Sequence, residues 1–185
     1  MPTNESFASE ATPAASAQID ARAAGDLLQF VSFRLGKEDF GVEILRVQEI
    51  IRMQDLTRIP NAPSSIEGVI NLRGRVIPII GLRERFGLES RPQDRETRIV
   101  VVEWKSEVFG FVVDSVSEVL RIAAATVEPP PRLSKRNNEY VSGVGKLPSR
   151  LILLLDVDRM MSDVEMAAIQ LGAASSAASE ETLVS

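Results

Sequence analysis

The sequence has 185 residues, 44% hydrophobic and 25% charged, an ordinary balance for a globular protein with room for one domain or two small lobes. The formal net charge of -5 argues against general binding to nucleic acid or anionic membranes, whose phosphates attract basic proteins. Cysteine and histidine are absent, which excludes disulfides, zinc sites with sulfur or nitrogen ligands, and nucleophiles that depend on an imidazole base.

Residues 1–26 are rich in alanine, serine, threonine, proline and acidic side chains, a composition typical of a disordered tail. They lack the basic start and the apolar block of a secretory signal. The longest aliphatic run, 151–155, is too short to span a bilayer. We therefore expect a cytoplasmic protein with no direct membrane insertion.

Between these residues and the chain end, the pattern is mostly that of β-strands separated by glycine and proline turns. Pro78 cannot donate a backbone hydrogen bond, so we expect it at a sheet edge or a bulge. The charged stretch 83–85 is expected to be a solvated edge. A helix is expected only at 158–171, where apolar residues recur along one stripe. In chain order, the expected strands are 27–35, 40–52 with a bend in its middle, 69–72, 76–82, 97–104, 108–121 and 150–157.

The turn of the hairpin 69–82 carries two arginines, Arg73 and Arg75, around Gly74. One interpretation is a solvated turn in which Gly74 supplies a positive φ. The other is a contact point for an acidic partner. Arginines make up 17 of the 21 basic residues, and a guanidinium suits bidentate carboxylate contacts better than an ammonium does.

The chain also repeats itself. "FGVEILRVQEIIR" at 40–52 matches "FGFVVDSVSEVLR" at 109–121, an offset of 69, and Gly68-Val69 matches Gly143-Val144 at an offset of 75. The repeat predicts two β lobes of one topology, about 27–90 and about 95–157, with strand exchange between them left open. Lobes this small are expected to share an apolar seam and to close into small barrels, which removes exposed edges.

Two further motifs have simpler explanations than chemistry. Asp156 and Asp158 resemble a carboxylate pair, but a helix N-cap is favoured over a metal or acid/base site. The segment "SGVGKLP" at 142–148 lacks the spacing of a phosphate loop, so we expect a turn between strands. We therefore predict no catalytic residue, no metal and no cofactor.

An oligonucleotide-binding barrel is the alternative hypothesis. Such a barrel would need aromatic stacking platforms in a basic groove. The chain has only nine aromatic residues, and most of its phenylalanines lie in apolar runs typical of a core.

The string "GVINLRGRVIPIIGLR" at 68–83, together with "VQEI" at 47–50, resembles the CheW family, the coupling proteins of bacterial chemotaxis. The similarity covers about residues 27–162. It implies an all-β fold of two tandem five-stranded SH3-like barrel lobes around a shared core, with a short C-terminal helix and a disordered tail at 163–185. It also implies a non-enzymatic scaffold that links the cytoplasmic tips of methyl-accepting chemoreceptors to the regulatory domain of the histidine kinase CheA.

Carried over to this sequence, the resemblance implies a receptor-binding role for Arg73 of "NLRG" and for Val47 and Glu49 of "VQEI". Gly68 and Gly110 match glycines at kinase- or receptor-facing turns, although a structural role is expected equally. The family commonly has aspartate where this chain has Gly81, which leaves the local geometry at that position open.

Overall fold

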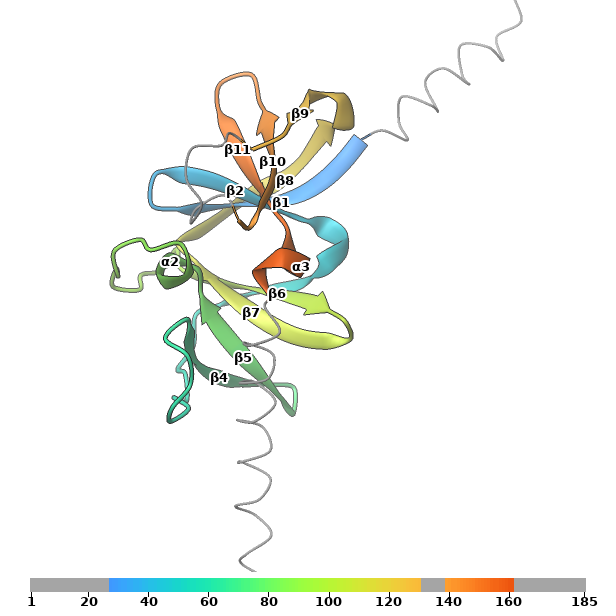
Figure 1. Ribbon diagram of the computed structural model, residues 1–185. Coiled ribbons are helices and arrows are strands. Elements are labelled where there is room, and N and C mark those ends of the chain that lie inside the picture. Colours follow the sequence, from blue (N-terminus) through green and yellow to red (C-terminus); the bar gives the residue numbers. More distant parts are fainter. Residues whose placement is uncertain (1–26, 131–138, 162–185) are drawn as a thin grey trace, which may run out of the picture.

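The computed structural model describes residues 27–130 and 139–161 (Figure 1). The expected tails, 1–26 and 163–185, and most of the expected helix 158–171 lie outside the described residues. The strands are β1 (Leu27–Leu35), β2 (Glu38–Glu43), β3 (Val47–Arg52), β4 (Ile66–Leu72), β5 (Arg75–Gly81), β6 (Arg98–Trp104), β7 (Glu107–Val113), β8 (Ser115–Ala123), β9 (Val127–Glu128), β10 (Val141–Lys146) and β11 (Leu151–Leu155). The short helical elements are η1 (Ile44–Arg46), α2 (Leu82–Arg85), η2 (Ala124–Thr126) and α3 (Val157–Met160).

The described strands form two sheets, which confirms the all-β prediction and is consistent with two SH3-like lobes. Sheet A has the order β8-β1-β2-β11-β10-β9, and sheet B has the order β3-β6-β7-β5-β4. Figure 1 shows sheet A above sheet B, with α2 and α3 near the junction. Each backbone ladder runs between two end strands, so the closed ladders expected for small barrels are not present in the described ranges. No helix within those ranges is long and apolar enough to cross a membrane.

The two sheets exchange strands between the halves of the chain. In sheet A, β2 of the first half pairs in parallel with β11 of the second, and Gly41 lies opposite Leu154. In sheet B, β7 of the second half pairs in parallel with β5 of the first, and Gly110 lies opposite Ile79. These partners are related by the offsets 69 and 75 of the sequence repeat. The duplication therefore extends to the register of the pairing between halves.

The strand exchange explains the two long segments of the repeat. The expected bend within 40–52 is η1, which takes the chain from β2 in sheet A to β3 in sheet B. The segment 108–121 was expected as one strand but forms two, β7 in sheet B and β8 in sheet A, which meet at Asp114. Each segment serves both sheets because the chain changes sheet in its middle.

Asp114 fixes this crossing. Its carboxylate accepts two hydrogen bonds from Arg83 of α2, at 2.7 and 2.6 Å, and one of 2.7 Å from the amide of Gly36 in the β1–β2 turn. Burial alone would raise the pKa of Asp114, but the bonds from Arg83 and Gly36 outweigh it and lower the pKa. The stretch 83–85 is therefore part of the junction between the sheets, and our expectation of a solvated edge was wrong.

Arg85 joins the same junction from the other side of α2. Its guanidinium donates a 2.6 Å hydrogen bond to the carbonyl of Met160 and lies 4.5 Å from the centroid of the Tyr140 ring. Such a cation–π contact adds to the hydrogen bond when it is partly shielded from water. A short helix in the first half thus holds the last described residues of the second half.

Two other expectations need correction. Pro78 lies in the internal strand β5, and the bulge in the β4–β5 pairing falls between Ile66 and Gly68, so Pro78 is at neither an edge nor a bulge. It is tolerated because Val69, opposite it, exchanges both backbone hydrogen bonds with Thr57 instead. The segment 142–148 was expected to be a turn, but most of it is strand β10. The turn comes after the strand, where the amide of Leu147 donates to the carbonyl of Arg150.

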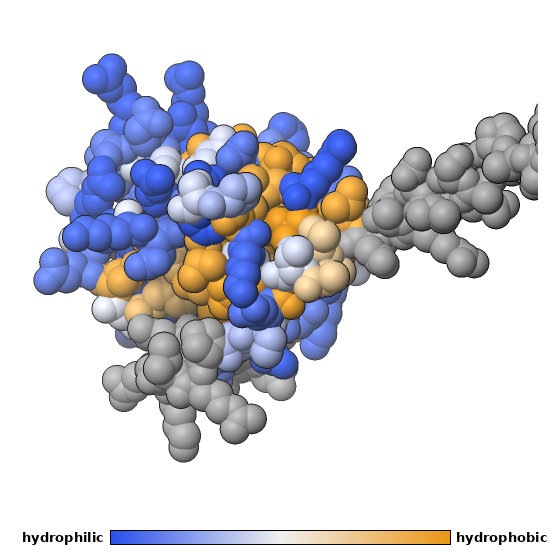
Figure 2. Space-filling view, turned by 90° about the horizontal axis from the view of Figure 1, so that it is seen from above, coloured by the Kyte–Doolittle hydropathy of each residue, from blue (hydrophilic) through white to orange (hydrophobic). Residues whose placement is uncertain are grey.

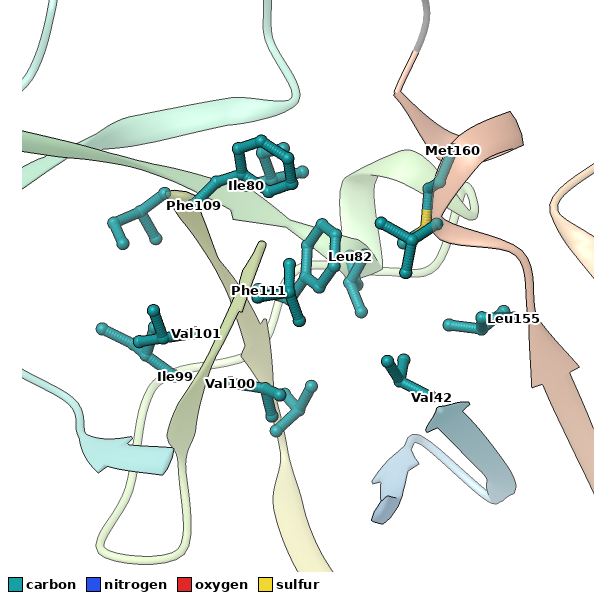
Figure 3. Close-up of a cluster of buried hydrophobic side chains, with 14 of the residues drawn as sticks. Val42, Ile80, Leu82, Ile99, Val100, Val101, Phe109, Phe111, Leu155 and Met160 are labelled. Atoms are coloured by element: carbon teal, nitrogen blue, oxygen red, sulfur yellow. The ribbon is translucent and has the colours of Figure 1, made fainter. Parts of the chain in front are cut away.

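The main core spans the junction between the sheets. One cluster contains Phe109, Phe111 and Leu82 together with Val42 of β2, and β11 and α3 contribute Leu155 and Met160 to it (Figure 3). These side chains are almost fully buried, which removes the apolar surface that a lobe of this size would otherwise expose. A smaller cluster in sheet A comprises Phe30, Ile122, Ile152 and Leu154. The shared core predicted from the repeat is thus present.

We predict that Gly110→Ala destabilises the protein more than Gly41→Ala does. A Cβ at Gly110 would lie 2.7 Å from Ile79 Cδ1 and closer still to Ile99 Cγ2, whereas at Gly41 the nearest atom would be Ile152 Cδ1 at 3.1 Å. Overpacking of this kind costs about 1–3 kcal/mol. Urea unfolding of both variants measures the difference, and an equal loss would show that the two parallel pairings are not packed as described.

Candidate functional site

The tip of the β4–β5 hairpin is a tight two-residue turn. Arg73 and Gly74 have φ angles of 52° and 82°, and positive values at both central positions are the pattern of a type I′ turn. The side-chain oxygen of Asn71 accepts a 2.8 Å hydrogen bond from the amide of Gly74. The predicted positive φ of Gly74 is confirmed. That of Arg73 was not expected, because residues other than glycine seldom adopt it.

The turn places the Arg73 side chain against β3. Its two terminal nitrogens donate to the two carboxylate oxygens of Glu49, at 2.8 and 2.9 Å. This is a bidentate pair, the strongest geometry available to arginine and a carboxylate. The Arg73 side chain is 77% exposed and the Glu49 side chain only 24%. The guanidinium therefore faces solvent, and the more buried carboxylate fixes its orientation. The structure therefore brings together two of the three residues predicted to bind the receptor.

The pair also bridges the two end regions of sheet B, because Glu49 belongs to the end strand β3 and Arg73 to the tip beside the other end strand, β4. Sheet A has a counterpart. Arg150, next to the β10–β11 turn, donates a 3.1 Å hydrogen bond to Glu118 on its end strand, β8. Glu118 is the repeat equivalent of Glu49. In each sheet an arginine–glutamate pair connects an end strand to a hairpin turn with which that strand shares no described backbone ladder.

Val47, the third predicted receptor-binding residue, begins β3 and is half-buried against the main core. Gly68 and Gly110 were expected at turns, but both are buried within strands, β4 and β7. Gly68 lets a neighbouring segment approach, since a Cβ there would lie 2.6 Å from the carbonyl oxygen of Thr57. The turn assignment is therefore corrected for both glycines, which permit close packing instead.

Gly81 leaves space for the side chain of Glu67. A Cβ on Gly81 would overlap the Glu67 carboxylate, so an aspartate at this position could not coexist with Glu67 as it lies here. Burial raises the pKa of Glu67, the nearby Glu84 raises it further, and Arg58 acts in the opposite direction. Glu67 lines a polar groove of about 560 Å³ beside α2. The sequence marks Gly81 as unusual, but nothing in the sequence indicates that Glu67 fills the space beside it.

The aspartates at the chain's end have structural roles. Asp156 caps α3 by accepting a hydrogen bond from the amide of Arg159, as the N-cap interpretation predicted. Asp158 bonds to Arg46 and to the indole of Trp104. Within residues 27–130 and 139–161, no group of three or more acidic side chains is arranged to hold a metal ion.

The surface of the described residues offers apolar contacts but no aromatic platform. The large hydrophobic side chains that are exposed in the described ranges are all aliphatic. Figure 2 looks down on sheet A and shows apolar side chains gathered between polar ones. Sheet A contributes Leu27, Val119 and Leu151 to the exposed set, at 43%, 52% and 60%.

Comparison with known proteins gives a consistent result. Residues 29–165 match the model of the CheW-like domain. The chain is 40% identical to a chemotaxis protein CheW of Klebsiella aerogenes, over 76% of this chain and 86% of the relative. It is 37% identical to chemotaxis protein CheW of Helicobacter pylori, over 74% and 82%. The crystal structure of scaffolding protein TtCheW from Thermoanaerobacter tengcongensis superposes with a TM-score of 0.69 at 34% identity, covering 75% of this chain and 90% of that one.

We predict that Glu67→Gln stabilises the protein at neutral pH and that the gain shrinks in acid. A carboxyl whose folded pKa is raised contributes stability below its unfolded pKa and loses it as the pH rises through the folded pKa. Glutamine removes that loss because it does not ionise. Urea unfolding across pH 4–8 measures the difference, with the exposed Glu38→Gln as control. A gain independent of pH would contradict the electrostatic origin.

Proposed function

The chain belongs to the CheW family, and from that premise we propose that it is a non-enzymatic scaffold that couples transmembrane chemoreceptors to the histidine kinase CheA in a chemotaxis array. The cytoplasmic tips of the receptors and the regulatory domain of the kinase are its partners. It works in the cytoplasm beside the membrane-bound array. Arg73, Glu49 and Val47 form the receptor-facing site, and the buried glycines Gly68 and Gly110 act indirectly, by fixing the strands that carry it.

The observation that carries this proposal is the rigid presentation of Arg73. The I′ turn fixes its backbone and Glu49 fixes its guanidinium, so little conformational entropy remains to be lost when a partner binds. A guanidinium has five N–H donors, and the pair uses two of them. The remaining donors can meet a carboxylate on an acidic receptor tip. Individual contacts of this kind can be weak, because an array multiplies valency.

We predict that Arg73→Glu abolishes coupling while the fold is kept. The variant sets two carboxylates against each other at the hairpin and presents the wrong charge to the partner. Receptor-dependent stimulation of CheA kinase activity in reconstituted membranes should fall about tenfold or more, and swarming on soft agar should be lost. Because Arg73 is largely exposed, the stability cost should be only about 0.2–1 kcal/mol.

The charge-swapped double variant Arg73→Glu/Glu49→Arg separates recognition from stability. It rebuilds an ion pair between the hairpin and β3, so the midpoint of thermal unfolding should recover. Coupling should stay lost, because the partner still meets a glutamate at the tip. If the double variant restored kinase stimulation, the pair would be structural only and the assignment of Arg73 to receptor binding would be wrong.

A further inference from the structure

Three arginines surround a small hollow at one end of sheet B. The hollow measures about 250 Å³ and lies where β3 ends and β6 begins. Arg52 contributes from β3, Arg98 from β6 and Arg95 from the loop before β6. Met53, Asp94 and Thr97 complete its lining. A cationic hollow is unexpected in a chain whose net charge is -5.

The three guanidinium groups have no carboxylate partner among the residues that the structure describes. In the described ranges, none of them forms an ion pair. The one acidic side chain in the lining, Asp94, is already engaged by Arg91 and by the amides of Glu96 and Thr97. Arg98 donates to the backbone carbonyls of Arg95 and Thr97, at 2.6 and 2.9 Å, which orients its guanidinium without neutralising it.

The register makes the arrangement costly in the free protein. Arg52 and Arg98 are direct cross-strand partners, and like charges opposite each other destabilise a sheet. The repeat supplies an internal comparison, because Arg121 on β8 is the equivalent of Arg52. Arg121 lies opposite Gln29, which is neutral. The like-charge pair is therefore not required by the fold.

The surroundings of the hollow favour a protein ligand over a nucleic acid. Ile50 lies two residues before Arg52 on the same side of β3 and is 41% exposed, which adds an apolar contact. β3 is an end strand of sheet B, so no second strand of the described ladder pairs with its outer edge. An oligonucleotide would need exposed aromatic rings for stacking, and the exposed large hydrophobic side chains among the described residues include none.

We propose that this hollow, lined by Arg52, Arg95 and Arg98, is a docking site for a carboxylate-rich segment of a partner protein. The guanidinium groups bind the acidic side chains of that segment, and Ile50 packs against an apolar residue in it. Binding offsets the repulsion between Arg52 and Arg98. The site is separate from the Arg73 hairpin and does not depend on its assignment.

The test titrates the full chain with a labelled peptide of glutamates around one leucine, followed by fluorescence anisotropy. Arg52→Glu should weaken binding about tenfold or more, because a carboxylate then faces the peptide. Arg121→Glu makes the same charge change at the repeat equivalent and should alter the Kd less than about twofold. Arg95→Glu, in a loop outside the sheet, provides a second variant that should weaken binding in the same way.

Thermal unfolding gives a second measurement, which distinguishes a binding role of Arg52 from a purely structural one. Arg52→Glu replaces a cross-strand repulsion with an Arg98–Glu pair, so its unfolding midpoint should match or exceed that of the wild type while peptide binding falls. Loss of both binding and stability would assign Arg52 to the fold instead and overturn the proposal. Equal effects of Arg52→Glu and Arg121→Glu would show a general charge effect and would also overturn it.

Two other occupants would be revealed by the same assay. Tighter binding of a single-stranded oligonucleotide than of the peptide would replace the proposal with a nucleic-acid site. The chain's own C-terminal segment carries Glu180 and Glu181 and no basic residue after residue 161. If Glu180→Gln/Glu181→Gln in the full chain tightened peptide binding about tenfold, this segment would be the ligand and the partner proposal would fail.

Discussion

The parallel pairing between the two halves of the chain is the constraint on which the rest of the structure depends. It sets β2 against β11 and β7 against β5, and it places a glycine at the point where each pair meets. A side chain at Gly110 would collide with Ile79 and Ile99, so the close approach exists only because this residue has none. The approach in turn brings side chains from both sheets into one core, and each half completes the fold of the other.

The candidate site follows from that framework. β3 and the β4–β5 hairpin lie at opposite ends of the ladder of sheet B and share no backbone pairing, so the side chains of Arg73 and Glu49 make the connection between them. The same connection in sheet A uses Arg150 and Glu118. An exposed arginine held in this way is both a link between parts of the sheet that share no ladder and a preorganised contact. Its two roles can therefore be separated only by reversing both charges at once.

Much of this could be predicted from local pattern. Alternating side chains identified most of the strands, Gly74 identified the tight turn, and Asp156 identified the start of α3. Strand β10 was taken for a turn because its glycines, such as Gly145, serve close packing rather than bending: a Cβ there would lie 2.8 Å from Ile152. The pairing of Arg73 with Glu49 could not be predicted, because nothing in a sequence states which distant side chain a hairpin tip will face. The repeat of Glu49 at Glu118 was the available hint.

The exchange of hairpins has a consequence for how such a molecule can assemble. Two separate chains of half this length, each lending its first hairpin to the other, would make the same pairings as a swapped homodimer. When the two halves belong to one polypeptide, their association becomes part of folding. The two halves therefore do not dissociate on dilution. Within a single chain the two halves need not be identical. One such difference is that Arg98 lies opposite Arg52 in sheet B, whereas Gln29 lies opposite Arg121 in sheet A.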